Sequence, residues 1–270
     1  MRVDSIHRIL FVFVLLALGS GCVSERTGRR VEKSNRIVTI ATDATFAPFH
    51  FLTESGEVSG FDVELARALV RRIGAMPKVE VVRPYDRLWS GLENREFDCV
   101  AATTGITPAR RQKWLMTDPY FQTAQVAVVR TGDNEPGSLA DMEGQRIGAA
   151  GTGTSWLAAQ SIRRARPTHL GKGQAGIPTL LAGDIDALIV DEFDGVDAAN
   201  KSNGALRLVP TPVALESYAV VLNRSSRELW RRLNRALESM RRDGSLAKLR
   251  KRFGLDRPDD WPVRFGHAGE

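Results

Sequence analysis

The stretch TTGITPAR, residues 103–110, follows an apolar run, Phe97–Ala102, that predicts a buried strand. In open α/β sheets, ligands bind where strands end and loops begin. The arginine that closes the stretch, Arg110, carries a planar, permanently charged guanidinium that pairs with a carboxylate through two parallel hydrogen bonds. We therefore predict that Arg110 binds the carboxylate of a small ligand, with an amino acid as the candidate. The alternative is that Arg110 and Arg111 are the solvent-exposed start of a helix.

Strands and helices alternate around this stretch. Residues 36–43, RIVTIATD, predict a strand that ends in the carboxylate of Asp43. A helix is then indicated by Leu65, Leu69 and Ile73, which recur every four residues. Such alternation is typical of an α/β fold with a largely parallel sheet.

A later segment repeats the same order of elements. Residues 92–100 and 181–188 each contain a helix end, a short turn, an aspartate and an apolar strand. The repeat predicts two lobes of one plan that share a cleft. The second strand ends at Asp191, so Arg110 and Asp191 together would receive the carboxylate and the ammonium of an α-amino acid. The alternative is that Asp191 only caps the next helix.

Two extended apolar runs, AQVAVV at 124–129 and SYAVVL at 217–222, predict a hinge of two strands. The chain would leave the first lobe along one run and return along the other. The predicted organisation is lobe 1 at 36–123 and 219–256, lobe 2 at 128–214, the hinge at 124–127 and 215–218, and a loose tail at 257–270.

A glycine-rich turn, GTGTS at 151–155, lies between a predicted strand and a predicted helix. Backbone amides in such a turn bind an anion. The turn lacks the features of a Walker loop and of a dinucleotide-binding motif, whereas a carboxylate is small enough for it. The alternative is that the turn is only a helix cap.

Charge and cysteine content exclude several classes of site. The formal net charge is +6 and the pI is about 9.7, but the basic residues are spread over outer faces of predicted helices. We therefore do not expect a nucleic-acid surface. Cys99 lies in an apolar strand and is predicted to be a small core residue. No metal-ligand spacing is found, and neither a metal nor a cofactor is predicted.

The beginning of the chain predicts export. Two positive side chains, Arg2 and Arg8, precede an apolar segment at 9–18. This segment is too short to span a bilayer as a helix. Residues 1–21 are therefore predicted to be a signal peptide. Residues 22–35 are polar and predict a flexible tether.

The residue after this signal, Cys22, is predicted to carry lipid. The segment resembles the lipobox of bacterial lipoproteins, although Gly19 stands where that motif usually has leucine. The protein would then lie in the periplasm or at the cell surface, anchored to the membrane through Cys22. The alternative is a plain secretory signal.

Eight segments together resemble a known family. They are ATDATFAPFHF (41–51), GFDVELA (60–66), FD (97–98), GITPAR (105–110), TDPYF (117–121), GTGTS (151–155), DALIVDE (186–192) and DGSLAKLRKRFG (243–254). Over residues 36–254 the chain resembles the periplasmic solute-binding proteins of polar amino-acid ABC transporters, extracellular solute-binding family 3, and GTG is most similar to the glutamine-binding members.

This resemblance implies a two-lobe type II periplasmic binding protein (Venus-flytrap) fold with a two-stranded hinge. It also implies capture of an amino acid, delivery to an ABC permease, and no catalysis. The implied roles are carboxylate binding by Arg110, Thr103, Gly105, Thr152 and Gly153; ammonium binding by Asp191 and the carbonyl of Ala102; ammonium or side-chain contact by Asp43; and side-chain packing by Phe46 and Tyr85.

At one position the sequence departs from the family. Five residues before the arginine, the family usually has a serine or threonine whose hydroxyl touches the ligand carboxylate, and here Gly105 stands. Either Thr103 and Thr104 compensate or the ligand differs, so the identity of the amino acid stays open.

An enzyme on the same fold is the second hypothesis. Cyclohexadienyl or arogenate dehydratases are similar to this family and need a general acid. Asp194 lies near the place where such an acid would fall. We predict a binding protein and not an enzyme.

Overall fold

The computed structural model describes residues 36–132, 134–151, 153–171 and 173–257. The predicted signal peptide, the tether with Cys22, Thr152, and the tail beyond Arg257 lie outside the described residues. By internal contacts the chain divides into residues 1–32 and a second unit from Lys33 to Glu270. Everything described below belongs to that second unit.

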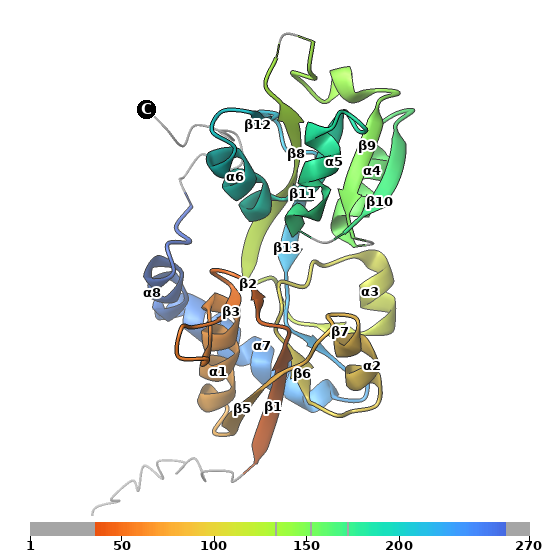
Figure 1. Cartoon of the computed structure of the whole chain (residues 1–270). Coiled ribbons are helices and arrows are strands. Elements are labelled where there is room, and N and C mark those ends of the chain that lie inside the picture. The colour runs from red at the N-terminus through yellow and green to blue at the C-terminus, as the bar shows by residue number, and fades with distance from the viewer. Residues whose placement is uncertain (1–35, 133, 152, 172, 258–270) are drawn as a thin grey trace, which may run out of the picture. The chain divides into compact units, whose positions relative to one another are not determined.

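The first sheet has the strand order β5-β1-β6-β14-β7 (Figure 1). Strand β1 is parallel to β5 and β6, whereas β14 is antiparallel to β6 and β7. The strands are β1 (Ile37–Thr42), β5 (Met76–Val81), β6 (Cys99–Val100), β7 (Leu115–Met116) and β14 (Val221–Leu222). A small antiparallel sheet adds β2 (Thr45–Phe46), β3 (His50–Leu52) and β4 (Val58–Ser59).

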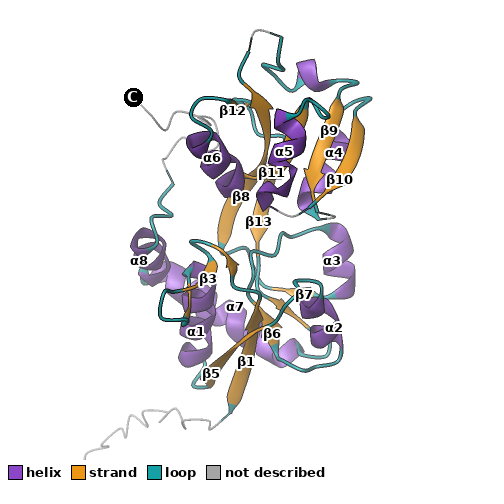
Figure 2. Cartoon of the chain, in the orientation of Figure 1, coloured by secondary structure: helices purple, strands orange, loops and turns teal. Residues whose placement is uncertain are grey.

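Helices flank this first sheet (Figure 2). They are α1 (Phe61–Arg72), α2 (Arg87–Glu93), α3 (Pro108–Lys113), α7 (Arg227–Arg242) and α8 (Ser245–Arg252). Leu229 and Leu233 of α7 pack in one core with Leu65 and Leu69 of α1, so this late helix contacts the helix that follows the first strands.

The second sheet has the order β10-β9-β11-β8-β12, and β13 also pairs with β8. Strands β9, β10 and β11 are parallel, and β8 is antiparallel to its neighbours. The strands are β8 (Phe121–Arg130), β9 (Arg146–Ala150), β10 (Arg166–Leu170), β11 (Ala187–Asp191), β12 (Leu206–Leu208) and β13 (Ala214–Tyr218). The helices are α4 (Thr154–Ser161), α5 (Ile177–Leu181), α6 (Glu192–Lys201) and the 3₁₀ turns η1 (Ala140–Met142) and η2 (Gly173–Gly176).

Strands β8 and β13 connect the two lobes (Figure 1). They pair from Phe121 with Tyr218 to Gln125 with Ala214. The prediction of one extended run at 217–222 was wrong in one respect, because β13 ends at Tyr218 and β14 belongs to the first sheet. At this break the chain leaves the second sheet, where β13 pairs with β8, and enters the first sheet. The Thr117 amide donates to the carbonyl of Val220 in the break at 2.9 Å. The predicted limits of the lobes and the hinge stay a prediction.

Each sheet is covered by apolar cores on two faces. Successive residues of β1 point to opposite faces of the sheet and pack in different cores, since Ile40 lies in one core and Ala41 in the other. Cys99 is buried in the first core, as predicted. Complete burial of a side chain such as Leu65 stabilises the fold by roughly 1.5–3 kcal/mol.

Helix α7 has Ser226 at its N-cap, and the Ser225 hydroxyl donates to the side chain of Asn223 at 2.9 Å. One local prediction was corrected by the structure. Within the apolar run 97–102, only Cys99 and Val100 pair as a strand. In the described part of the chain, no helix combines the length and the apolar character needed to cross a membrane.

Candidate functional site

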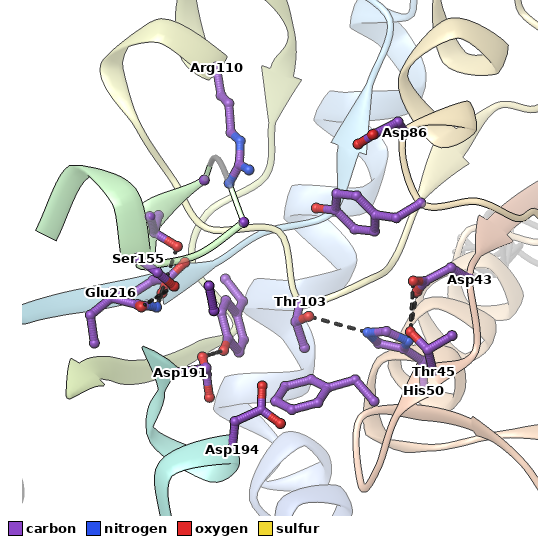
Figure 3. Close-up of a pocket in the computed structure, with 18 of the residues that line it drawn as sticks. Asp43, Thr45, His50, Asp86, Thr103, Arg110, Ser155, Asp191, Asp194 and Glu216 are labelled. Atoms are coloured by element: carbon purple, nitrogen blue, oxygen red, sulfur yellow. Dashed lines mark hydrogen bonds and ion pairs between the residues drawn. The ribbon is translucent and has the colours of Figure 1, made fainter. Parts of the chain in front are cut away.

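A cavity of about 420 Å³ lies between loops of the two sheets (Figure 3). Most of the residues predicted for the site line it, and these are Asp43, Phe46, Tyr85, Thr103, Arg110, Gly153 and Asp191. Ala102 and Gly105 do not line it. Thr152 lies outside the described residues.

Arg110 projects from α3 toward the cavity (Figure 3). The Thr107 side chain caps this helix by accepting from the Arg110 amide at 3.1 Å. The Arg110 Nη1 atom donates to the Gly105 carbonyl at 2.8 Å, and the guanidinium carbon lies 5.6 Å from the centre of the Trp89 ring. Arg110 is half-buried whereas Arg111 is exposed, so the solvent-exposed alternative describes Arg111 only.

The glycine turn of the second lobe approaches this guanidinium closely. A Cβ atom added to Gly153 would lie 3.3 Å from the Arg110 Nη2 atom. Gly153 is the N-cap of α4, and no side chain caps that helix start. The arginine of one lobe therefore faces the backbone of a helix start in the other, and both attract an anion.

Asp191 caps the next helix and also lies at the cavity, so capping is not its only feature, and its binding of an ammonium stays a prediction. Its Oδ1 atom accepts from the Phe193 amide at 3.0 Å and caps α6. Its Oδ2 atom accepts from the Tyr218 hydroxyl, and the residue lines the cavity. Burial, and then the charge of Glu216, raise the pKa of Asp191 well above its usual range, against the opposing hydrogen bond from Tyr218.

The backbone at Thr103 does not have the predicted role. Its amide donates to Asp62 at 2.5 Å and is not available to a ligand. This direction follows from a left-handed backbone, with φ of 43°, which is uncommon for a threonine. Burial raises the pKa of Asp62 to about 6, even though the Thr103 amide and His50 favour the charged form. Only the side chain of Thr103 is left to face the cavity.

Gly105 is covered by a side chain that sequence reasoning missed. A Cβ atom added to Gly105 would overlap Oε1 of Glu216 and lie 2.8 Å from the Thr154 Cγ2 atom. Gly105 also bridges to Tyr218 through the backbone. The hydroxyl expected at this position is therefore replaced by the approach of the Glu216 carboxylate. Ala102 is likewise fully buried beneath the cavity.

Glu216 belongs to a polar network within the hinge strands. The Gln125 side-chain amide donates to Glu216, and the Ser155 hydroxyl donates to the Gln125 Oε1 atom at 2.7 Å. Burial raises the pKa of Glu216, while hydrogen bonds from Gln125 and Thr154 and the charge of Arg110 act in the other direction. The sequence does carry a signal for this network. Gln125 is a polar residue within the first apolar hinge run, and Glu216 lies directly before the second.

A second network connects Asp43 to the cavity wall. The Asp43 Oδ1 atom lies 3.1 Å from His50 Nδ1, and the His50 Nε2 atom lies 3.2 Å from the Thr103 hydroxyl. The Thr45 hydroxyl donates to Asp43 at 2.8 Å. His50 is buried in the strand after the aromatic loop, and its role was not predicted.

Aromatic rings form part of the remaining wall. Phe46 stacks on Phe49 with ring centres 5.5 Å apart, and Tyr85 contacts Trp89 edge-on at 5.6 Å. Asp194, on which the dehydratase hypothesis depends, also lines the cavity. Burial, and then the charge of Asp197, raise the pKa of Asp194 to about 6.

Residues 38–256 match the bacterial extracellular solute-binding proteins, family 3. The chain belongs to this family. It is 26% identical over 229 residues to the L-cystine-binding protein TcyJ of Escherichia coli K12, covering 83% of this chain and 85% of that one. It is 29% identical over 231 residues to the histidine-binding periplasmic protein of Salmonella typhimurium, covering 80% and 86%.

Solved structures of amino-acid-binding proteins share the fold. The arginine-, lysine-, histidine-binding protein ArtJ of Geobacillus stearothermophilus superposes with a TM-score of 0.71 at 28% identity, covering 83% of this chain and 97% of that one. An ancestral arginine-binding protein bound to arginine gives 0.69 at 26% identity, covering 82% and 99%. The predicted family and the type II periplasmic binding protein fold are thereby confirmed, and these relatives are named as binding proteins rather than enzymes.

Proposed function

We propose that this protein captures an amino acid in the cavity between its lobes and delivers it to an ABC permease. The supporting observation is that Arg110 and Asp191, which come from opposite lobes, line one cavity of about 420 Å³. Cavities of roughly 300–1,000 Å³ are typical of small-molecule sites. A cation and an anion on opposite walls match the two charged groups of an α-amino acid.

In this proposal the two lobes bind different ends of the ligand backbone. The guanidinium of Arg110 and the turn at Gly153 bind the carboxylate, and Asp191 binds the α-ammonium. Phe46 and Tyr85 pack against the ligand side chain. Because the groups come from both lobes, the ligand favours the closed arrangement, which is the state a permease would recognise.

The names of relatives support an amino acid as the ligand class. They include a histidine-binding periplasmic protein and a probable amino-acid ABC transporter-binding protein of Haemophilus influenzae. The predicted signal peptide and Cys22 extend the proposal to a lipid-anchored protein outside the cytoplasm. Cell fractionation of a Cys22→Ser variant tests this part, since loss of the anchor would move the protein from the membrane to the soluble fraction.

A thermal-shift screen tests the capture of an amino acid. The ligands are the twenty amino acids, ornithine and polyamines. A ligand at a hundred times its Kd stabilises the folded state by about 2.7 kcal/mol, which raises the melting temperature. We expect at least one amino acid to do so. A response to polyamines alone, or to none of the compounds, contradicts the proposed function.

A further inference from the structure

The cavity wall carries more negative than positive charge. Among the described residues that line it, five are carboxylates, whereas Arg110 is the single guanidinium and His50 the single imidazole. The carboxylates surround the cavity from both lobes and from strand β13 (Figure 3). They are Asp43, Asp86, Asp191, Asp194 and Glu216.

Two of these carboxylates are held by neutral groups. Asp191 accepts from the Tyr218 hydroxyl and the Phe193 amide, and Glu216 accepts from the Gln125 amide. Arg110 donates to a backbone carbonyl instead, and within the described part of the chain it forms no ion pair. A buried charge that forms no ion pair is costly, and burial raises the pKa of both carboxyl groups, although the nearby charge of Arg110 acts in the other direction on Glu216.

A neutral α-amino acid does not balance the negative charge of the carboxylates in the cavity wall. Its carboxylate would pair with Arg110 and its ammonium with Asp191, so the ligand adds no net charge and Glu216 gains no counter-ion. A ligand with a second positive group would supply the missing charge. Aromatic rings of Phe46, Tyr85 and Trp89 also line the cavity, and their faces attract cations.

The position of Glu216 depends on Gly105. Any side chain at 105 would overlap the Glu216 carboxylate where it now lies. Gln125 of β8 and Thr154 of α4 bond that carboxylate, and Ser155 in turn bonds Gln125. Gly105 thus leaves room for the Glu216 carboxylate, and the hydrogen-bonded network keeps this carboxylate at the cavity wall.

We propose that the cavity selects amino acids with a second cationic group, a guanidinium or a side-chain ammonium, and that Glu216 is one residue that determines this selectivity. The inference rests on the proposed function, because it takes Arg110 as the carboxylate site. It adds a requirement on the ligand side chain, which the proposed function leaves open.

Calorimetry on the unmodified protein tests the selectivity. The ligands are arginine, lysine, ornithine, glutamine and leucine at neutral pH. We expect the three cationic amino acids to bind at least about tenfold tighter than glutamine, as for a buried charge pair. Glutamine or leucine binding as tightly would overturn the selectivity and leave amino-acid capture intact. Binding by none of the five would overturn both.

A Glu216→Gln variant tests the role of the residue. Glutamine keeps the shape and still accepts from Gln125, so only the charge is lost. We expect the affinity for arginine and lysine to fall about tenfold or more, while that for glutamine is unchanged. Equal losses for both classes would show a structural role and overturn the assignment.

Two further variants complete this test. Glu216→Asp keeps the charge and should keep the preference for cations, which separates charge from packing. Glu228→Gln, on the exposed side of α7, makes the same chemical change outside the cavity and should alter neither affinity. If Glu216→Gln does not fold, loss of the cationic preference in Glu216→Asp would itself contradict the role of the charge.

Discussion

The Arg110 side chain at the cavity is fixed by two contacts close in sequence and by one ring from an earlier helix. Arg110 is positioned by Thr107, by the Gly105 carbonyl and by the Trp89 ring. The next arginine along the chain, Arg111, is exposed. The two adjacent arginines therefore provide a matched pair for testing the carboxylate site.

Replacing Arg110 with alanine should weaken ligand binding. The change removes a charged, two-bond contact from a half-buried site, and such truncations cost roughly 2–5 kcal/mol of binding free energy. Calorimetry with the ligand found in the screen measures the loss. Arg111→Ala is the control and should bind normally. An unchanged affinity in Arg110→Ala would exclude the carboxylate role.

A serine at position 105 should disturb the cavity by moving one of the side chains that line it. Its Cβ atom would displace the Glu216 carboxylate from Gln125. We expect Gly105→Ser to reduce the affinity for arginine or lysine about tenfold, as Glu216→Gln does. Gly132→Ser is the control, because the nearest atom to its added Cβ lies at 3.6 Å. If Gly105→Ser binds both cations with native affinity, the Glu216 carboxylate is not constrained by this glycine.

Residue identities at the site were predictable only where local sequence carries them. Asp191 ends an apolar strand, and Arg110 lies at the start of the helix that follows another apolar run, in the region of a sheet where ligands bind. Glu216 is marked only by its polarity beside an apolar run, and the imidazole of His50 has no local mark, because the partners of both side chains come from other elements. The bond from the Thr103 amide to Asp62 could not be predicted, since its direction depends on the backbone conformation and on a residue far earlier in the chain.

At the scale of elements, the segment after α8 joins the two lobes beside the hinge. Arg257 pairs with Glu192, the first residue of α6, and its Nη2 atom donates to the Gln122 carbonyl at 3.1 Å. The guanidinium also lies 4.8 Å from the Phe121 ring centre. Chain from the end of the first lobe thus contacts both β8 and α6.

Replacing Arg257 with alanine should destabilise the protein. The pair is largely buried, with side-chain exposures of 18% and 10%, and removal of one partner from a buried pair costs about 3–5 kcal/mol. Urea denaturation measures the free energy of unfolding. Arg242→Ala, which removes an exposed ion pair of α7, serves as the control with little expected change. A native midpoint for Arg257→Ala would show that this contact does not stabilise the fold.

Element types followed from the sequence more readily than element limits. A strand was predicted before the glycine turn at 151–155, and β9 ends at Ala150, directly before that turn. The run at 217–222 was divided between two sheets, since the partners of its two halves differ. Local periodicity specifies which face is buried but not which strand lies opposite.

For the whole molecule, buried carboxyl groups make stability depend on pH. Burial raises the pKa of Asp62 and of Asp194 to about 6, and raises that of Asp191 and Glu216. The folded protein therefore binds more protons than the unfolded chain above about pH 4. The contribution of Asp62 and Asp194 to stability is present at acid pH and is lost as pH rises through about 6.

The melting temperature of the ligand-free protein measures this effect. We expect the contribution of Asp62 to fall between about pH 4 and 7. In Asp62→Asn, which keeps an acceptor for the Thr103 amide, the melting temperature should fall less over the same range. Asp243, whose pKa is lowered to about 2, titrates below this window. Equal pH slopes in both proteins would exclude a raised pKa at Asp62.

The overlap between a side chain at 105 and the Glu216 carboxylate also limits the order in which substitutions are tolerated. A hydroxyl residue at 105 displaces the Glu216 carboxylate while that side chain keeps its length, whereas shortening the side chain at 216 first removes this overlap. The effects of the two changes should therefore be non-additive, as for residues in contact. A change of ligand preference would therefore have to begin at position 216 in strand β13, and not at position 105, which position 216 contacts.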